Sequence, residues 1–385
     1  MKKIILPFVI LIITILSVNC SSDKNANTDI KILKLPESGE ETLKASYIAD
    51  TLIYIPLETT KESLMDQDIR QIWLDNYYIL INCKNTGLLL FRQDGKFLKK
   101  IGKQGRGPGE YGTILHFDVI LDTIYISSTS RRGFLRYTFD GNFCDEIKLN
   151  YQPVFFSTTV DQKLACYCIE EGKIYVYNNL HNPPNTIVVE YGVTKGRYKW
   201  SLRDTHMTFL QKYSKGLLFY DYKSDTVWNI TENKKELAFI VDLKNKLPFD
   251  KQIEFCNGDL QGWNKMVTSY QQVHIFPLPS YTFIFQKHWR GAWYDAIYLF
   301  NTKTMETKKF NKFWISDDIV SGDRISPINF AYSKDCLVAF GYPPSEKDLE
   351  ENKANAKQAR SQLWLNQMKT VKEGDNPILV KLILK

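Results

Sequence analysis

The sequence predicts an all-β fold, a six-bladed β-propeller, from three features: a repeated hairpin pattern, six groups of strands, and a spare strand near the N-terminus. The hairpin pattern is an aromatic residue, Asp-Gly and a second aromatic residue, at 91–97 and again, 46 residues later, at 137–143. Asp-Gly between two strand-forming runs is typical of a two-residue hairpin turn. A period of this size made of hairpins indicates one propeller blade per repeat.

Runs of β-branched and aromatic residues, bounded by turn residues, define the six groups. The predicted blades cover 69–101, 114–149, 154–191, 206–243, 273–313 and, for the sixth, 328–340 with 377–384. The sixth group is one strand short, whereas the segment 47–57 has no blade of its own. Pairing of 47–57 with 377–384 would complete the last blade and leave the ring without an open edge.

Long connections fall on one face of the predicted propeller. In a four-stranded blade, the link from the second to the third strand and the crossing to the next blade leave at the same face. The long segments of this kind are 102–112, 192–204, 245–272 and 343–376, the last being a helical insertion in blade six. Because rigid scaffolds carry binding sites on such loops, we expect this face to bind a ligand. Loop growth without function is the alternative, and it would have affected both faces.

The N-terminus predicts export and lipid anchoring. Two lysines precede an apolar run over 4–18, which is typical of a signal peptide at 1–19 and is too short for a transmembrane helix. Cys20 follows directly, so we expect it to be the lipidated first residue; an ordinary secretory signal with an incidental cysteine is the alternative. The polar segment 20–46 predicts a flexible tether and 47–385 the propeller. These features indicate a cell-envelope lipoprotein of the outer membrane. Its lipid alone would attach it to that membrane, and the sequence leaves open on which side.

Charge and cysteine content restrict the class of protein further. The formal net charge of +7 falls to +5 without residues 1–19, and the charges are scattered, which argues against a nucleic-acid partner. An even number of cysteines in an exported chain allows disulfides, although we prefer buried free thiols and expect a monomer. Besides Cys20, the cysteines are Cys83, Cys144, Cys166, Cys168, Cys256 and Cys336.

Three sequence elements resemble a known family. The glycine-rich segment Gly102–Tyr111, ending in Gly-Pro-Gly-Glu-Tyr, resembles the NHL-repeat pattern. Together with Ile55–Thr60 and Asp375–Val380, it makes residues 45–385 resemble the six-bladed β-propeller lipoproteins of Bacteroidota, a domain of unknown function. The resemblance implies a cell-envelope propeller without an established reaction.

Two groups on the elaborated face are candidate ligand-binding residues. The glycine-rich segment lacks the ending of a phosphate-binding loop and precedes a strand, so we interpret it as a crossing between blades, with Arg106 and Glu110 near the channel mouth. The second group is an aromatic cluster in blade five, which either stacks on sugars or a partner, or packs between blades. Its members are Trp289, Arg290, Trp293 and Tyr294.

Histidines provide a candidate metal site. His116, His206 and His274 each fall near the start of a predicted innermost strand, so their side chains could converge on calcium or zinc in the channel. Separate, non-ligating histidines are the preferred interpretation, and no cofactor is predicted. The leading hypothesis is therefore a non-catalytic module that binds or scaffolds a glycan, peptide or envelope protein. A metal-dependent hydrolase or lyase at the channel mouth is the alternative.

Overall fold

The structure is a computed structural model that describes residues 32–385 with internal gaps. The longer gaps are 179–186, 193–208, 244–270, 289–295 and 344–358. The shorter ones are 67, 169, 214–215, 222–223, 232, 279, 321–323, 334–335, 342 and 373.

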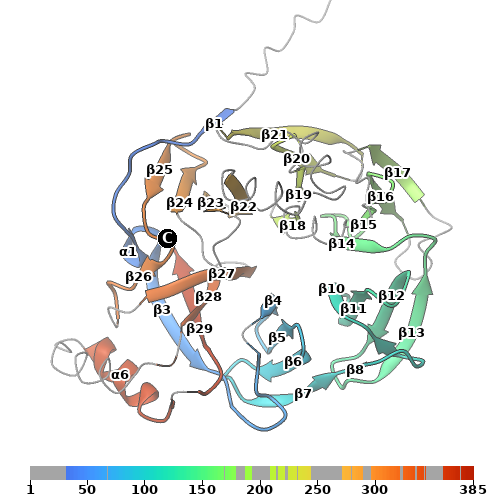
Figure 1. Cartoon of the computed structure of the whole chain (residues 1–385), viewed down its shortest axis with the longest axis horizontal. Coiled ribbons are helices and arrows are strands. Elements are labelled where there is room, and N and C mark those ends of the chain that lie inside the picture. The colour runs from blue at the N-terminus through green and yellow to red at the C-terminus, as the bar shows by residue number, and fades with distance from the viewer. Residues whose placement is uncertain are drawn as a thin grey trace, which may run out of the picture.

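Six β-sheets form a ring around a central channel, so the predicted all-β six-bladed propeller is confirmed (Figure 1). Each blade is an antiparallel sheet whose first strand lies innermost. Blades one to three are β4 (Ile69–Leu74), β5 (Tyr78–Cys83), β6 (Gly87–Arg92) and β7 (Phe97–Ile101); β10 (Ile114–Ile120), β11 (Thr123–Ser128), β12 (Gly133–Tyr137) and β13 (Phe143–Lys148); and β14 (Pro153–Thr158), β15 (Leu164–Cys168), β16 (Lys173–Tyr177) and β17 (Ile187–Gly192). Blades four and five are β18 (Phe209–Tyr213), β19 (Gly216–Asp221), β20 (Thr226–Ile230) and β21 (Lys235–Asp242), then β22 (Gln271–Pro277), β23 (Tyr281–His288), β24 (Ala296–Asn301) and β25 (Thr307–Phe310).

The sixth blade joins the two ends of the chain. Its strands are β27 (Arg324–Ser333), β28 (Cys336–Gly341), β29 (Ile378–Leu384) and, outermost, the N-terminal β3 (Ala49–Pro56). β3 and β29 are antiparallel, with Ile378 opposite Pro56 and Leu384 opposite Ala49. The predicted closure by 47–57 and 377–384 is confirmed. Buried Leu52, Leu379 and Leu382 lie at this seam, so apolar packing reinforces the backbone pairing.

The Asp-Gly hairpins have a different turn from the one predicted. In blade one the Gly95 N–H donates to Arg92 O, and the Arg92 N–H donates to Lys96 O at 2.8 Å. Only the glycine has a positive φ, +87° at Gly95 and +82° at Gly141. The prediction of a two-residue turn is therefore wrong, because each loop has three residues ending in a left-handed glycine, with a bulge in the ladder beside it.

Residues 32–46 are not a free tether. β1 (Ile32–Lys34) pairs in parallel with β21 at the outer edge of blade four, and β2 (Leu43–Lys44) pairs with β26 (Ile315–Ser316), which extends the blade-six sheet. A short helix, α1 (Ala45–Ile48), then leads into β3. The predicted tether over 20–46 is wrong for this part, because Leu33 and Leu43 are buried against the blades. Residues 20–31 lie outside the described residues.

One helix of the predicted insertion is described, α6 (Ala359–Met368), which packs outside blade six near β3 (Figure 1). The side chains of Trp364, Leu365 and Met368 are buried in the core cluster of blades five and six. The Trp364 ring meets the Tyr54 ring of β3 edge to face, with centroids 6.0 Å apart. These apolar residues therefore hold the helix on the closing strand. Within the described ranges, no helix is long and apolar enough to span a membrane.

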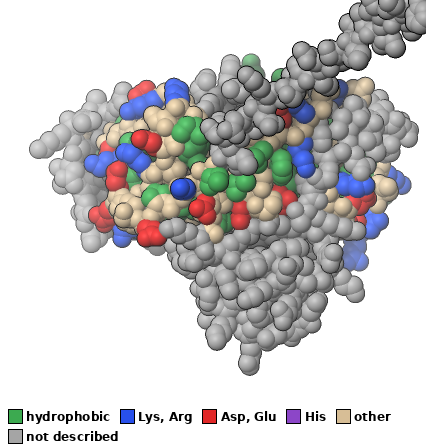
Figure 2. Space-filling model, turned by 90° about the horizontal axis from the view of Figure 1, so that it is seen from above, with side chains coloured by type: hydrophobic (Ala, Val, Ile, Leu, Met, Phe, Trp, Pro, Cys, Tyr) green, Lys and Arg blue, Asp and Glu red, His purple; other side chains and the backbone are tan. Residues whose placement is uncertain are grey.

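Both signs of charge occur on the described surface. On the side of the molecule shown in Figure 2, Lys and Arg side chains alternate with Asp and Glu side chains around exposed apolar groups. The charges in this view are scattered, as the sequence predicts.

Leu52 and Ile53 give a matched test of the closure. Leu52→Ala should lower the free energy of unfolding by about 2–5 kcal/mol, because Leu52 is 6% exposed against β29. Ile53 is the next residue of β3 but is 44% exposed, so Ile53→Ala should cost about 1 kcal/mol or less. Urea denaturation of both variants measures the difference; equal losses would contradict the packing of β3 in the ring.

Candidate functional site at the ends of the propeller channel

Two faces follow from the topology. The crossings between blades and the turns from second to third strands leave at one end of the channel, which we call the crossing face; it includes 84–86 and 102–112. The turns from first to second strands leave at the other end, which we call the hairpin face. This face includes 75–77, 121–122 and 159–163.

The glycine-rich crossing is a structural element of the rim. Two short parallel strands, β8 (Lys103–Gln104) and β9 (Glu110–Tyr111), pair within it, and β8 lies at the outer rim between β7 and β13 (Figure 1). The Tyr137 hydroxyl donates to Gly109 O at 2.5 Å, and the Arg131 guanidinium donates to Gly107 O. These bonds fasten the crossing to blade two. This agrees with its interpretation as a turn between blades.

Glu110 and Arg106 do not form a site at the mouth. The Glu110 carboxylate accepts the Gly107 N–H at 2.9 Å, and with Lys103, 3.4 Å away, this lowers its pKa. A Cβ at Gly105 would lie 2.0 Å from Glu110 Oε2, so a side chain at this position would displace the folded-back carboxylate. Arg106 is exposed beside Glu110 on the same rim segment. The crossing runs over the outer strands rather than at the channel mouth, and ligand binding by Arg106 and Glu110 stays a prediction.

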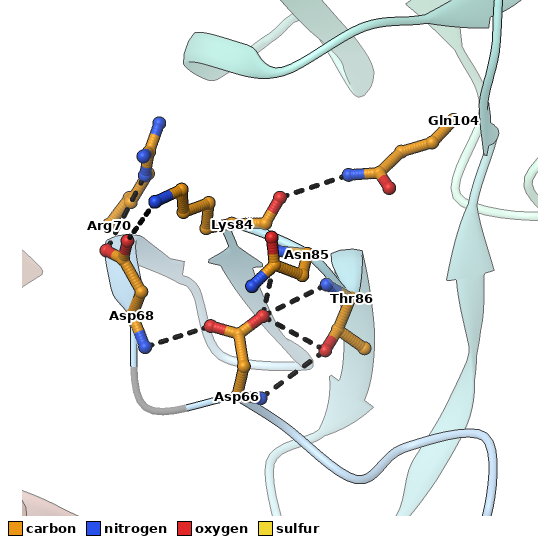
Figure 3. A network of polar contacts seen from close by, with 7 residues as sticks. All are labelled: Asp66, Asp68, Arg70, Lys84, Asn85, Thr86 and Gln104. Carbon is orange, nitrogen blue, oxygen red and sulfur yellow. Dashed lines mark hydrogen bonds and ion pairs between the residues drawn. The ribbon is translucent and has the colours of Figure 1, made fainter.

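A polar network instead lies at the crossing-face end of blade one (Figure 3). The Asp66 carboxylate accepts the backbone N–H groups of Asp68 at 2.9 Å, Asn85 at 2.8 Å and Thr86 at 3.1 Å. Gln104 donates from its side chain to Lys84 O at 3.1 Å. Asp66 thus fixes the loop before β4 to the turn between β5 and β6.

Two cations share one carboxylate beside this network. Arg70 Nε lies 3.6 Å from Asp68 Oδ1, and Lys84 Nζ lies 3.4 Å from Asp68 Oδ2. Figure 3 shows both head groups converging on Asp68. Arg70 Nε is buried, and no described group accepts a hydrogen bond from it. Lys84 and Asp68 are both about half exposed, and an ion pair of this kind contributes about 0–1 kcal/mol.

Sequence reasoning missed Asp68, Arg70 and Lys84, although the strand layout gave an indication for two of them. Arg70 is the second residue of the innermost strand, and Lys84 lies in a turn that the blade layout assigns to the elaborated face. Their ion pairing with Asp68 depends on how the loop at 57–68 folds over blade one. The loop has no repeat or motif that fixes its path.

Polar side chains join the innermost strands of four consecutive blades. The Gln71 amide of β4 donates to Phe117 O at 2.6 Å and accepts the Phe117 N–H of β10 at 3.0 Å. Further on, Ser157 of β14 donates to Asp118 Oδ2 at 2.7 Å. Lys212 of β18 donates to Thr158 Oγ1 at 2.8 Å. This chain of contacts lines the channel toward its hairpin-face end.

Two titratable groups in this wall have shifted pKa values. Burial raises the pKa of Asp118 from 3.8 to about 6, and the bonds from Ser157 and the Val119 N–H oppose the shift. Burial lowers the pKa of His116 from 6.5 to about 4. The His116 ring packs edge to face on Phe155 and Phe156, with centroids 5.4 and 5.0 Å away.

The remaining predicted site residues have separate outcomes. His116 packs on aromatic rings, and among the described residues no group of three potential ligands could hold a metal ion. His206 and the side chain of His274 lie outside the described residues, so the metal site stays a prediction. The aromatic cluster Trp289, Arg290, Trp293 and Tyr294 also lies outside them. So do Cys20 and Cys256; Cys83, Cys144, Cys166 and Cys168 are free thiols.

The fold defines the class of protein: a six-bladed β-propeller closed by its own N-terminal strand. The family follows from the sequence comparison. The chain belongs to the family described as domain of unknown function DUF4934, whose model matches residues 29–382. A search of curated proteins found no match.

Solved structures share the fold. A candidate exported protein from Bacteroides fragilis is 18% identical, covering 92% of this chain and 99% of its own, with a TM-score of 0.68. A virginiamycin B lyase from Staphylococcus aureus is 13% identical, covering 75% and 81%, with a TM-score of 0.42. The first likeness supports the fold alone, and the second is too weak to support a functional argument.

Asp118→Asn and His116→Gln should change the pH dependence of stability in opposite directions. The raised pKa of Asp118 stabilises the fold below about pH 4, and this contribution is lost as pH rises through about 6. The lowered pKa of His116 leaves the fold unaffected above about 6.5 and destabilises it as pH falls toward 4. As pH rises from 4 to 6, the stability of the wild type minus that of Asp118→Asn should therefore fall. Over the same range, the stability of the wild type minus that of His116→Gln should rise.

Urea denaturation at several pH values within this window measures both differences. A difference that does not vary with pH would contradict the burial assigned to that group.

Proposed function

We propose that the protein is a non-catalytic binding or scaffolding module of the cell envelope, which holds an acidic group of a glycan, peptide or envelope protein at the crossing face of blade one. The observation that carries this proposal is the Asp68–Arg70–Lys84 cluster, in which two cations share one carboxylate at the end of the channel.

The charges of this cluster favour an anionic ligand. The Asp66 carboxylate is occupied by backbone N–H groups, so Arg70 and Lys84 share Asp68 as their ion-pair partner and carry N–H donors for a ligand. A guanidinium beside an ammonium suits the paired oxygens of a carboxylate or phosphate, and hydrogen bonds to charged groups are stronger than neutral ones.

The surroundings of the cluster are rigid, which favours binding. Asp66 ties the turn that carries Lys84 to the loop that carries Asp68, and Gln71 ties β4 to β10 directly after Arg70. Side chains held in place before the ligand arrives lose less entropy on binding. The propeller therefore acts as a fixed frame for this contact.

Cell-envelope location rests on two further observations. The N-terminal pattern of lysines, apolar run and Cys20 is that of a lipoprotein signal. One solved structure that shares the fold is a candidate exported protein. We propose that Cys20 carries the lipid and that this lipid, rather than the propeller, attaches the protein to the outer membrane.

The ligand site is tested with charge variants that act in opposite directions. On an array of acidic and neutral glycans and peptides, Arg70→Gln/Lys84→Gln should weaken binding to acidic members at least tenfold, because two charged contacts are lost. Asp68→Asn should strengthen the same binding, because it removes the internal competitor for both cations. Lys148→Gln, an exposed lysine on β13, is the matched control and should change nothing.

Binding of acidic members that is equal in the wild type and the double variant would overturn the assignment of the site. Stronger binding by the double variant would do the same.

Lipid anchoring has its own test. Cys20→Ala should abolish the incorporation of labelled palmitate into the protein, because Cys20 is the proposed attachment point of the lipid. Equal incorporation by the variant and the wild type would contradict anchoring through Cys20.

A further inference from the structure

Three adjacent turns of the hairpin face carry exposed apolar side chains. Tyr77 lies in the turn after β4, Leu121 in the turn after β10 and Val160 in the turn after β14. They are 70%, 65% and 52% exposed. Because burial of apolar surface stabilises the fold, these exposed tips contribute little to it.

The three turns lie side by side around the end of the channel. Gln71 connects β4 to β10, and Ser157 connects β10 to β14, so the turns that follow these strands are neighbours. The Tyr78 ring, next to Tyr77, stacks on Phe139 of blade two with centroids 4.8 Å apart. We call the exposed residues Tyr77, Leu121 and Val160 the tip surface.

Leu121 occupies a backbone conformation that does not suit leucine. Leu121 and Asp122 form a two-residue turn with φ values of +47° and +57°. Such turns favour Asn and Gly, and a bulky side chain at positive φ is unusual. Since Leu121 is both exposed and in the left-handed region, neither packing nor turn geometry explains a leucine here.

Carboxylates accompany the apolar tips. Each of the three turns contains one aspartate, Asp75, Asp122 or Asp161, and the only lysine among these turn residues is Lys163. Asp75 accepts the backbone N–H groups of Tyr77 and Tyr78, whereas Asp122 and Asp161 are exposed. The tip surface is therefore apolar, with exposed carboxylates in two of its three turns. A cationic partner with apolar side chains complements both properties.

We propose that the tip surface docks a basic segment of a partner protein whose apolar side chains contact Tyr77, Leu121 and Val160. Its cationic side chains face Asp122 and Asp161. At the centre, the Asp118–Ser157 pair and Lys212 form a polar floor just inside the channel. An anionic bilayer is the less favoured occupant, because the carboxylates of Asp122 and Asp161 would face lipid phosphates.

This surface lies at the opposite end of the channel from Arg70 and Lys84, so the two proposals stand independently. A protein that holds an acidic ligand at one face and a basic partner at the other would connect the ligand to the partner.

The test uses synthetic twelve-residue peptides and the full mature chain. An alternating Lys-Leu peptide should bind saturably, whereas Glu-Leu and Lys-Ser peptides of the same length should bind at least tenfold more weakly. Isothermal titration calorimetry gives the affinities. Hydrogen–deuterium exchange should show protection at 75–77, 121–122 and 159–163.

Variants separate docking from folding. Tyr77→Ser/Leu121→Ser/Val160→Ser should weaken Lys-Leu binding at least tenfold, and Leu64→Ser/Leu98→Ser, at two exposed leucines elsewhere, should leave it unchanged. Asp122→Asn/Asp161→Asn should weaken binding and reduce its dependence on salt. Leu121→Asn should raise the thermal unfolding midpoint, because Asn tolerates positive φ, while it weakens binding.

Several results would overturn the proposal. One is equal affinity for the Lys-Leu and Glu-Leu peptides. Another is unchanged Lys-Leu affinity in the triple variant, and a third is protection from hydrogen exchange that is confined to regions outside the three turns. Binding of phosphatidylglycerol vesicles that is lost in the triple variant would assign the surface to a membrane instead.

Discussion

Pairing of β3 with β29 is the interaction on which the rest of the structure depends. A ring of blades without it would end in an open sheet edge, which exposes unpaired N–H and C=O groups. The pairing also brings together distant parts of the chain: β3 carries Tyr54, whose hydroxyl donates to buried Asp317 at 2.5 Å, and the following loop binds Asn376. That loop continues to Asp66 and Asp68, so ring closure positions the crossing-face cluster.

The two ends of the channel differ in chemistry although one set of innermost strands supports both. At the crossing face, Arg70 and Lys84 share the carboxylate of Asp68. At the hairpin face, apolar tips alternate with aspartates. Because hydrogen bonds between β4, β10, β14 and β18 fix the strands relative to one another, the two faces are held rigidly apart. Such a frame suits a scaffold that joins two binding partners.

Local patterns in the sequence predicted the architecture, since strand runs and turn residues are short-range signals. Blade boundaries, the closing strand and the structural nature of the glycine-rich crossing follow from them. The same patterns misjudged residues whose environment is set by distant packing. Leu33 and Leu43, in the expected tether, are buried against the blades, and the helical insertion buries Trp364 against β3. Glu110 was misplaced because its carboxylate folds back on Gly107. Arg70 and Lys84 escaped notice because their common partner arrives from another loop.

Native-state hydrogen exchange of the β3 and β29 amides tests ring closure most directly. If β3 is an integral strand of the last blade, its amides and those of β29 exchange only through the same global unfolding event, with equal free energies of opening. Exchange of the β3 amides at a lower free energy than those of β29, while the other blades stay protected, would show that the ring does not depend on its N-terminal strand.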